Sequence, residues 1–425
     1  MRRRSLATAV STALLPFALA TAPALLSACS GNDDGETGDD DDDDDDDAPA
    51  DCSTRPTAIP TARGEVEGAY SPVTGQFVFF GGDEGVPVNC QSQTIFRNDT
   101  WVFEEDCGNW REIEGDAPFR ASRYAAGYDS VRDRFVIFGG RFRDGTAGRY
   151  TLRKTASAYS FGDESWSDLP EGPEKRAIHA GVVAGDRFVI YGGTGSTDGA
   201  SFSPVYDDTW VLDLENETWS QLDIPGGPGG RVFHAMATDG ADKVWLYGGG
   251  DENAFFGPFF GDVWELDLAA GSWTELHSGN GPNTPEGRIG PDMHYDEANN
   301  QLLIWAGHDI SDLGNNNQLH SFNLNSNSFS TVRAGDVIDA GSNGFCDFPA
   351  DFVAIEENTP ERRYLSASAL TDDGRMYTFG GKTDCGIIND MWSYDVSLDE
   401  WTMHTRATDG ESCVRAYDDC STLCF

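Results

Sequence analysis

The sequence predicts an all-β fold built from six repeated units, each of them a sheet of four antiparallel strands. Two observations support this prediction: six apolar runs each end in a pair of small residues, and two tryptophans recur nine positions apart later in four of the units. The small pairs are Gly81-Gly82, Gly139-Gly140, Gly192-Gly193, Gly248-Gly249, Ala306-Gly307 and Gly380-Gly381. The steps between them are 58, 53, 56, 58 and 74 residues. This is a period just above fifty residues with one long insertion, and such a period is typical of stacked supersecondary units.

The aromatic spacing identifies the second half of each unit. Four units keep two tryptophans, namely Trp101 and Trp110, Trp210 and Trp219, Trp264 and Trp273, Trp392 and Trp401. The second unit has Ser157 in the first position and keeps Trp166, and the fifth unit has His320 and Phe329. Two units have therefore lost residue types but kept the spacing, so the count remains six.

These features resemble the kelch repeat over residues 57–408. The resemblance implies a six-bladed kelch-type β-propeller, similar to the propeller of galactose oxidase, with four antiparallel strands per blade. Physical reasoning agrees, because one blade cannot bury both faces alone and radial closure protects its edges. Glycine permits a bend at the end of the second strand, and the paired aromatics supply apolar area between blades. The chain is expected to begin with the innermost strand of blade one and to end with the outermost strand of blade six.

The N-terminus has the features of an export signal. Arg2 to Arg4 are followed by an apolar stretch that ends at Leu26-Ser27-Ala28-Cys29, which resembles the lipobox of bacterial lipoproteins. The resemblance implies a signal peptide over 1–28 and a lipid on Cys29, and the alternative is an ordinary signal peptide cut after Ala28. Ser30 after the cysteine favours the outer membrane by the enterobacterial sorting rule.

Charge sets the expectations for partners. The chain carries 72 Asp and Glu against 29 Lys and Arg, a net charge of −43, which disfavours nucleic acid and anionic lipid surfaces as partners. Membrane contact is therefore expected through the lipid anchor only. Residues 29–56 include nine consecutive aspartates, Asp39 to Asp47, and are predicted to form a disordered tether.

The remaining eight cysteines suggest disulfides in an exported protein. They are Cys52, Cys90, Cys107, Cys346, Cys385, Cys413, Cys420 and Cys424, so units two to four contain none. In a closed ring, the first and last units are neighbours, and cross-links there would secure the seam. The preferred single pair is Cys346 with Cys385. Residues 409–425 form a separate cysteine-rich tail without the CxxC spacing of a zinc site.

Each unit has an arginine before its first strand. The six are Arg63, Arg120, Arg176, Arg231, Arg288 and Arg363, five of them in a Pro-x-x-Arg motif and Arg120 in a shorter Pro118-x-Arg120. They are candidates for an anion site at the channel mouth, such as a carboxylated sugar or a peptide carboxylate. The alternative is that each arginine pairs with acids of an adjacent blade, as kelch arginines commonly do.

An aromatic loop adds a second candidate for ligand contact. It contains Phe255, Phe256, Phe259 and Phe260, which could stack on sugar rings, contact a protein or pack on a neighbouring loop. His179 and His234 are expected to be structural. The sequence predicts no catalytic residue, cofactor or metal site.

The function expected from these features is that of a monomeric, lipid-anchored binding or scaffolding module at a Gram-negative cell envelope. It would recognise a protein or glycan through the face with the long loops. The alternative is a carbohydrate-active enzyme of oxidase, lyase or epimerase type at the channel mouth. Convergent titratable residues or a metal in the channel would favour the enzyme.

Overall fold

The computed structural model describes residues 58–84, 95–115, 117–145, 148–199, 201–309, 315–338, 358–383 and 386–408, together with Cys52, 353–354 and Glu356. The described part is all-β and contains six four-stranded antiparallel sheets, consistent with kelch blades. They are called blades 1 to 6 below.

Blade 1 consists of β1 (Gly68–Ser71), β2 (Gln76–Phe80), β3 (Thr100–Glu104) and β4 (Asn109–Glu112), and blade 2 of β5 (Ala125–Asp129), β6 (Arg134–Phe138), β9 (Ala156–Ser160) and β10 (Ser165–Leu169). Blade 3 consists of β11 (Ala180–Ala184), β12 (Arg187–Tyr191), β13 (Thr209–Asp213) and β14 (Thr218–Leu222), and blade 4 of β15 (Ala235–Thr238), β16 (Lys243–Tyr247), β17 (Val263–Asp267) and β18 (Ser272–His277). Blade 5 consists of β19 (Asp292–Asp296), β20 (Gln301–Trp305), β21 (Leu319–Asn323) and β22 (Ser328–Arg333), and blade 6 of β26 (Ala367–Leu370), β27 (Arg375–Phe379), β30 (Met391–Asp395) and β31 (Glu400–Thr405).

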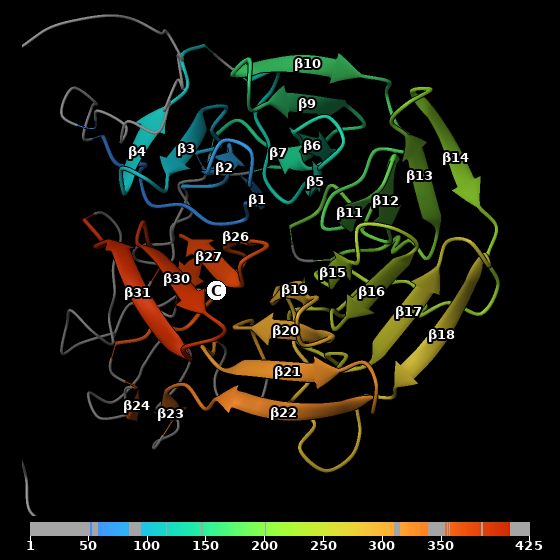
Figure 1. Cartoon of the computed structure of the whole chain (residues 1–425). Helices are drawn as coiled ribbons and strands as arrows, with labels where there is room; N and C mark the ends of the chain where they lie inside the picture. Colours follow the sequence, from blue (N-terminus) through green and yellow to red (C-terminus); the bar gives the residue numbers. More distant parts are fainter. Residues whose placement is uncertain are drawn as a thin grey trace, which may run out of the picture. The chain divides into compact units, whose positions relative to one another are not determined.

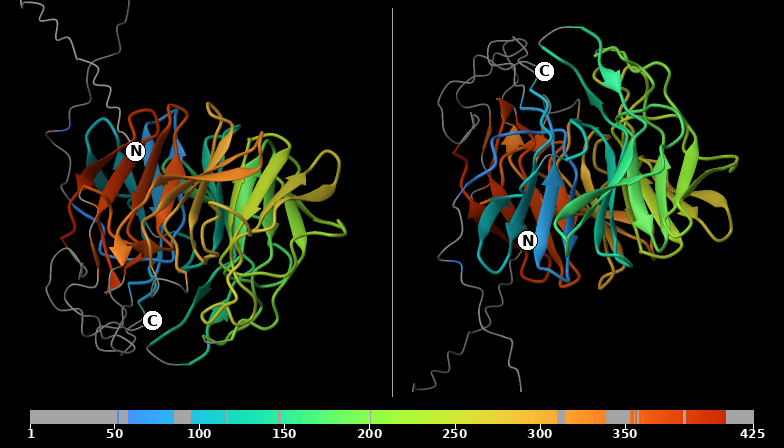
Figure 2. Two further views of the ribbon diagram at one scale, coloured as in Figure 1. Left: turned by 90° about the horizontal axis from the view of Figure 1, so that it is seen from below. Right: turned by 90° about the horizontal axis from the view of Figure 1, so that it is seen from above.

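Within each blade, the strands pair in chain order, so the chain enters on the innermost strand and leaves on the outermost one. The turns after the first and third strands lie on one face, called the turn face. The other connections lie on the opposite face, called the loop face. This face carries the short strands β7 (Arg141–Phe142), β8 (Thr151–Leu152), β23 (Val337–Ile338), β24 (Val353–Ala354), β25 (Arg363–Tyr364), β28 (Lys382–Thr383) and β29 (Gly386–Ile387). The teal hairpin of β7 and β8 projects from the loop face in both views of Figure 2.

The blades are arranged in a ring, with blade 6 beside blade 1 (Figure 1). The innermost strands β1, β5, β11, β15, β19 and β26 contact one another in this order, and β26 contacts β1. Because each inner strand has a neighbour on both sides, no blade face is left at an end of the row. The strand order therefore matches the expected start and end of the chain.

A ring of backbone hydrogen bonds joins all six blades on the loop-face side of these strands. The N–H groups of Glu65, Arg123, Ile178, Phe233, Gly290 and Leu365 each donate to the carbonyl of the preceding member, and Glu65 donates to Leu365, at 2.8–3.2 Å. All six residues have positive φ angles of 55–62°. We call these residues the channel ring. A left-handed conformation is costly for most side chains, so its repetition in five non-glycine residues shows that closure determines the backbone here.

The second aromatic residue of each unit packs across a blade interface. Its cross-strand partner is always the residue two positions after the first aromatic site, for example Leu266 opposite Trp273 and Phe322 opposite Phe329. The ring contacts across the six interfaces are Trp110 with Phe379, Trp166 with Phe80, Trp219 with Phe138, Trp273 with Tyr191, Phe329 with Tyr247 and Trp401 with Trp305. The centroid distances are 4.8–6.1 Å, within the range of favourable aromatic pairs. The two units with altered residues keep both register and packing.

The glycine pairs make the close approach between blades possible. The N–H of Gly249 donates to the carbonyl of Arg288 in the next blade at 2.9 Å. Gly249 has a φ of 93°, and a Cβ atom on it would lie 2.6 Å from the carbonyl oxygen of Val232. A side chain is therefore excluded here by both conformation and space.

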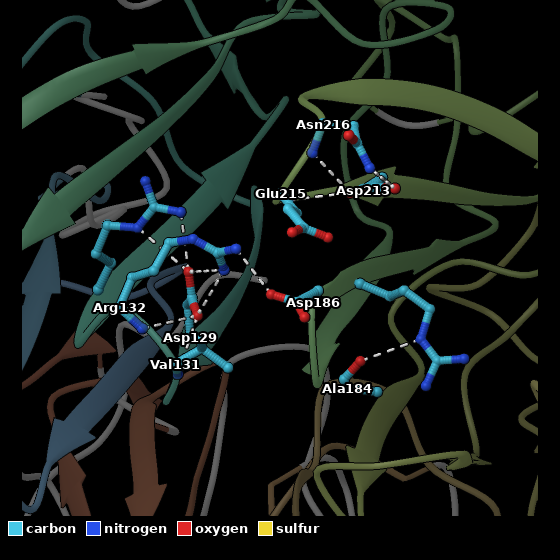
Figure 3. Close-up of polar contacts among 10 residues, drawn as sticks. Asp129, Val131, Arg132, Ala184, Asp186, Asp213, Glu215 and Asn216 are labelled. Carbon is cyan, nitrogen blue, oxygen red and sulfur yellow. Dashed lines mark hydrogen bonds and ion pairs between the residues drawn. The ribbon is translucent and has the colours of Figure 1, made fainter.

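Ion pairs also link neighbouring blades on the turn face. Figure 3 shows Asp129, in the first turn of blade 2, accepting hydrogen bonds from the backbone of Val131 and Arg132. The side chain of Arg132 contacts Asp129 and reaches Asp186 of blade 3 at 2.7 Å. Similar pairs join Arg187 to Asp242, Arg111 to Glu164 and Arg375 to Glu105. The last pair lies at the interface between blades 6 and 1.

Candidate functional site

Five of the six predicted arginines are buried and bonded within their own blade. Arg231 donates through Nη1 and Nη2 to Asp262 at 2.8 and 3.0 Å and through Nη1 to the carbonyl of Gly248 at 3.0 Å. Trp264 Nε1 also donates to the carboxylate of Asp262, at 2.7 Å. Arg176 with Asp208 and Arg363 with Asp390 repeat this arrangement, and Arg63 donates to Asp99 through Nη1 alone, with Nη2 donating to Thr61 Oγ1. The acid belongs to the same blade, which corrects the expectation of a partner in an adjacent blade.

Blade 5 keeps the geometry with neutral partners. Arg288 donates to Asn316 Oδ1 at 2.9 Å and to Gln318 Oε1 at 3.1 Å, and His320 Nε2 lies 3.2 Å from the same Gln318 oxygen. His320 thus takes the place of the tryptophan donor. All five of these arginines have at most 2% of their surface exposed, so they hold the scaffold rather than face solvent.

Blade 2 differs from the sequence interpretation. Gly82 donates its N–H to Ala121, whereas the corresponding glycines of the other blades donate to an arginine carbonyl. Ala121 therefore occupies the arginine position, and Arg120 lies one residue earlier. Its side chain is 41% exposed, pairs with Asp144 at 2.8 Å and lies 5.1 Å above the ring of Phe142. Of the six arginines, Arg120 is the one whose predicted ligand contact remains accessible.

The aromatic loop is mostly packed against its neighbours. Phe255 contacts Phe202 and Phe233 at centroid distances of 5.0 and 5.6 Å. Phe259 contacts His308, and Phe260 lies under the guanidinium group of Arg231. Phe256, in contrast, is 77% exposed and extends from the loop face. The interpretation of this loop as a contact surface is therefore retained for Phe256.

The described residues contain one disulfide, between Cys52 and Cys107, which connects the segment before blade 1 to the turn between β3 and β4. The predicted pair Cys346 and Cys385, the lipidation site Cys29 and the predicted tether, apart from Cys52, lie outside the described residues. The cysteine-rich tail, 409–425, lies outside them as well.

A cavity of about 900 Å³ follows the ring axis. The channel ring lines one end of it, and the residues Pro72, Ser130, Gly240 and Gly374 at the turn face line the other. Among the described residues, none of the loop-face side chains above the channel ring lines this cavity. The cavity therefore extends from the channel ring toward the turn face, the face opposite the long loops.

One wall of the cavity carries titratable groups. Confinement between the channel walls raises the pKa of Glu67 to about 8, and the charge of nearby Asp292 adds to this effect, although the residue is exposed toward the cavity. Burial likewise raises the pKa of Asp292 to about 7 against the opposing hydrogen bond from Ser366, which donates at 2.6 Å. Burial lowers the pKa of His294 to about 4, and its Nε2 lies 2.9 Å from Ser368 Oγ. Sequence patterns did not indicate this cluster.

A second cluster lies at the loop-face side of the channel ring. Glu65 accepts hydrogen bonds from Arg123, Lys382 and Ser122 and forms an ion pair with Arg141 at 4.0 Å. These residues were also missed. The available signal was their position: Glu65 and Arg123 follow the arginine site by two residues, and Arg141 and Lys382 follow a glycine pair directly.

His179 and His234 lie where structural histidines were expected. Both are buried, and both rings pack on the aromatic residue that precedes a glycine pair, Phe138 and Tyr191 respectively. Burial lowers the pKa of His234 to about 3, so its ring is neutral near pH 7. Within the described residues, no group of three or more His, Cys, Asp or Glu could hold a metal ion. No helix in this part of the chain is long and apolar enough to cross a membrane.

Comparison with known proteins identifies relatives of low identity. The flagellar outer arm dynein alpha chain of Chlamydomonas reinhardtii is 25% identical over 47% of this chain, which spans 4% of that protein. Kelch domain-containing protein 10 of Xenopus tropicalis is 23% identical over 60% of this chain and 56% of its own length. The N-(sulfonatooxy)prop-2-enimidothioate sulfolyase of Thlaspi arvense is 27% identical over 40% of this chain and 48% of its own length. The chain thus covers less than two thirds of each of these relatives.

Two family models match the chain itself. The KLHDC2/KLHL20/DRC7 Kelch-repeats domain matches residues 68–288, which is 221 of the 425 residues. The Kelch motif matches residues 363–403, which cover blade 6. The matched regions contain five of the six small-residue pairs, five of the six positions with the nine-residue spacing, and the contacts Arg176–Asp208, Arg231–Asp262 and Arg363–Asp390. The chain therefore belongs to the kelch-repeat family.

Proposed function

We propose that this chain is a closed six-bladed kelch propeller that acts as a binding module, anchored by a lipid on Cys29 to the outer membrane of a Gram-negative cell. Its loop face recognises a protein or glycan at the cell envelope. Kelch propellers serve as binding scaffolds in general, and loops on a rigid scaffold are where recognition concentrates. The anchor and the location rest on the N-terminal sequence, which lies outside the described residues.

One observation carries the proposal: the repeated residues are used by the scaffold, while the loop face presents large side chains that do not repeat. The repeated arginines and aromatics are bonded or packed inside the blades. Phe256 is 77% exposed on this face, and the side chain of Arg120 is 41% exposed. Exposed aromatic and arginine side chains are the types enriched at interaction hot spots.

The test is a glycan array and an envelope pull-down with the full chain and two variants. Phe256→Ala combined with Arg120→Gln removes these two exposed side chains from the loop face without changing a buried residue. Val73→Ala is the matched control, because Val73 is 74% exposed in the turn between β1 and β2 on the opposite face. We expect the double variant to lose a ligand that the control retains. Equal retention by all three proteins would rule out the loop face as the binding surface.

The anchor can be tested separately. Cells that express the wild-type chain should incorporate labelled palmitate into it, and the Cys29→Ser variant should not. The variant should also leave the membrane fraction. Labelling of the variant to the wild-type level would contradict lipidation at Cys29.

A second candidate function is supported by the titratable wall of the channel. Glu67 and Asp292 carry raised pKa values near neutrality, which suits general acid–base chemistry, and a relative is named as a sulfolyase. In this case the chain is a carbohydrate-active enzyme whose cavity admits substrate from the turn face. Turnover of a panel of oligosaccharides by the wild-type chain, lost in Glu67→Gln and kept in Phe256→Ala, would support this candidate. Absence of turnover across the panel would contradict it.

A further inference from the structure

The cluster of Arg123, Arg141 and Lys382 around Glu65, called the basic cluster below, is built from three different blades. Arg123 belongs to the channel ring, Arg141 opens β7, and Lys382 opens β28. Arg123 Nη2 donates to Glu65 Oε1 at 2.5 Å, and Lys382 Nζ binds the same oxygen. Ring closure brings these residues together, because Lys382 lies in the blade next to blade 1 in the ring but is 317 positions from Glu65 in the chain.

Several donors of the basic cluster lack acceptors. Arg123 is 7% exposed and Arg141 is 3% exposed. Nevertheless, Arg123 Nε, Arg123 Nη1 and Arg141 Nε are buried without a hydrogen-bond partner in the part of the chain that the structure describes. The ion pair of Arg141 with Glu65 spans 4.0 Å, too long for a hydrogen bond. Buried polar groups are nearly always satisfied in folded proteins, so unpaired guanidinium donors indicate a missing acceptor.

The charges of the cluster agree with a missing anion. Three cations surround Glu65, and Asp83 lies close enough to act on Arg141 and Lys382. Burial works to raise the pKa of Glu65, but Arg123, Lys382 and Arg141 hold it well below its usual value. Burial and the charge of Arg123 lower the pKa of Arg141 to about 10, so this cation lacks full compensation. One further negative charge would balance the cluster.

Aromatic rings hold the two guanidinium groups in place. Arg141 lies 3.8 Å above the ring of Tyr150, and Arg123 lies 4.8 Å above the ring of Phe233. Stacking occupies the faces of a guanidinium group and leaves its N–H groups available at the edge. A planar set of N–H donors at this edge matches the paired oxygens of an oxyanion.

We propose that the basic cluster binds an oxyanion group, a carboxylate, sulfate or phosphate, carried by the ligand of the loop face. This inference rests on the proposed function and specifies the chemistry of its ligand. The oxyanion of the ligand accepts hydrogen bonds from the unpaired N–H groups of Arg123 and Arg141, and Lys382 adds positive charge. The site differs from the predicted ring of Arg63, Arg176, Arg231, Arg288 and Arg363. Both terminal Nη groups of each of those arginines are engaged within the blades, and only Nε of Arg176 and Arg231 lacks a partner in the described part of the chain.

The test measures binding of defined anions to the full chain in detergent. Sodium sulfate, phosphate and glucuronate are titrated at constant ionic strength, with sodium chloride as the reference, and thermal shift and calorimetry report binding. Arg123→Gln and Arg141→Gln remove the unpaired donors. Arg187→Gln is the matched control, since it changes a partly exposed arginine on the opposite turn face that pairs with Asp242 at 3.0 Å.

We expect at least one anion to raise the melting temperature above the chloride reference. The two cluster variants should weaken its binding by roughly tenfold or more, because charge-assisted contacts to buried arginine are strong. The control should bind as the wild type does. The anion that binds most tightly identifies the source of the oxyanion. Glucuronate represents a sugar acid, and the sulfate and phosphate ions represent the sulfate and phosphate ester groups of a ligand.

Two results would overturn the inference. One is that no anion stabilises the wild-type chain beyond chloride, and the other is that Arg141→Gln binds the anion as tightly as the wild type. The proposed function would survive either result if an envelope ligand is still retained and is lost with the Phe256 and Arg120 double variant. If the anions bind as expected but no envelope ligand is retained, the proposed function fails while the anion site stands.

Discussion

Removal of one carboxylate from the arginine–aspartate contacts should destabilise the whole ring. In Asp262→Ala, Arg231 keeps its charge at 2% exposure but loses a bidentate partner, and Trp264 Nε1 loses its acceptor. Breaking a buried pair costs about 3–5 kcal/mol, and the lost neutral hydrogen bond about 1 kcal/mol. Because the Asp262 side chain is 17% exposed, water reaches part of the site, and the lower end of the range for breaking a buried pair applies. We expect a loss of about 3 kcal/mol.

The assay is urea unfolding of the full chain at pH 7, followed by tryptophan fluorescence and extrapolated to water. Asp144→Ala is the control, because its pair with Arg120 is exposed and should contribute less than about 1 kcal/mol. Replacing both members of the buried pair, Arg231→Met with Asp262→Leu, should recover part of the loss, since no unpaired charge is left. Equal effects of Asp262→Ala and Asp144→Ala would refute the assignment of these arginines to the scaffold.

Three further results are expected from the structure. Gly249→Ala should lower the free energy of unfolding by roughly 2 kcal/mol or more, because its Cβ would meet the Val232 carbonyl. Gly271→Ala, which has open space around it, should lower it by only about 1 kcal/mol, and equal losses of the two variants in urea unfolding would contradict this reasoning. The raised pKa values of Glu67, about 8, and Asp292, about 7, exceed the unfolded values of about 4.3 and 3.9, so stability from their protonation is complete below pH 4 and is lost as pH rises through 7 and 8. Glu67→Gln should therefore flatten the fall in urea midpoint between pH 5 and 8.5, and an unchanged slope would disprove the raised pKa. Cys52→Ser should lower stability by about 2–4 kcal/mol through loss of a cross-link over 55 residues, and a reducing agent should reproduce this effect in the wild type but not in the variant.

The architecture could be predicted because local constraints repeat in the sequence. The second residue of each small pair is a glycine at all six places where two blades meet at hydrogen-bond distance, and the nine-residue spacing places an aromatic residue opposite the same cross-strand position. Even His320 follows this logic, because it replaces a tryptophan N–H donor with a ring nitrogen near Gln318. A position can keep its physical role when its residue type changes, so the nine-residue spacing predicted the fold more reliably than residue identity did.

The site could be predicted only in part, because it depends on which blades become neighbours and in what register. Arg120 matched a linear motif, yet Ala121 is the residue that receives the hydrogen bond from Gly82. The channel-ring position holds glutamate, arginine, isoleucine, phenylalanine, glycine and leucine in turn, so no residue type marked it. Nor could the sequence show that Arg123 and Lys382 would share one oxygen of Glu65.

The hydrogen bond from Glu65 to Leu365 has a consequence for how the chain is made. The two residues are 300 positions apart, so blade 1 leaves the ribosome long before blade 6, its neighbour on the other side, has been synthesised. Until blade 6 arrives, Phe79 and Trp110 lack the contact with Phe379 that covers them in the finished protein. Non-local contacts of this kind form late and slowly. The growing chain therefore has to remain unaggregated with an apolar flank uncovered, and a shortened product without its last blade would retain that flank permanently.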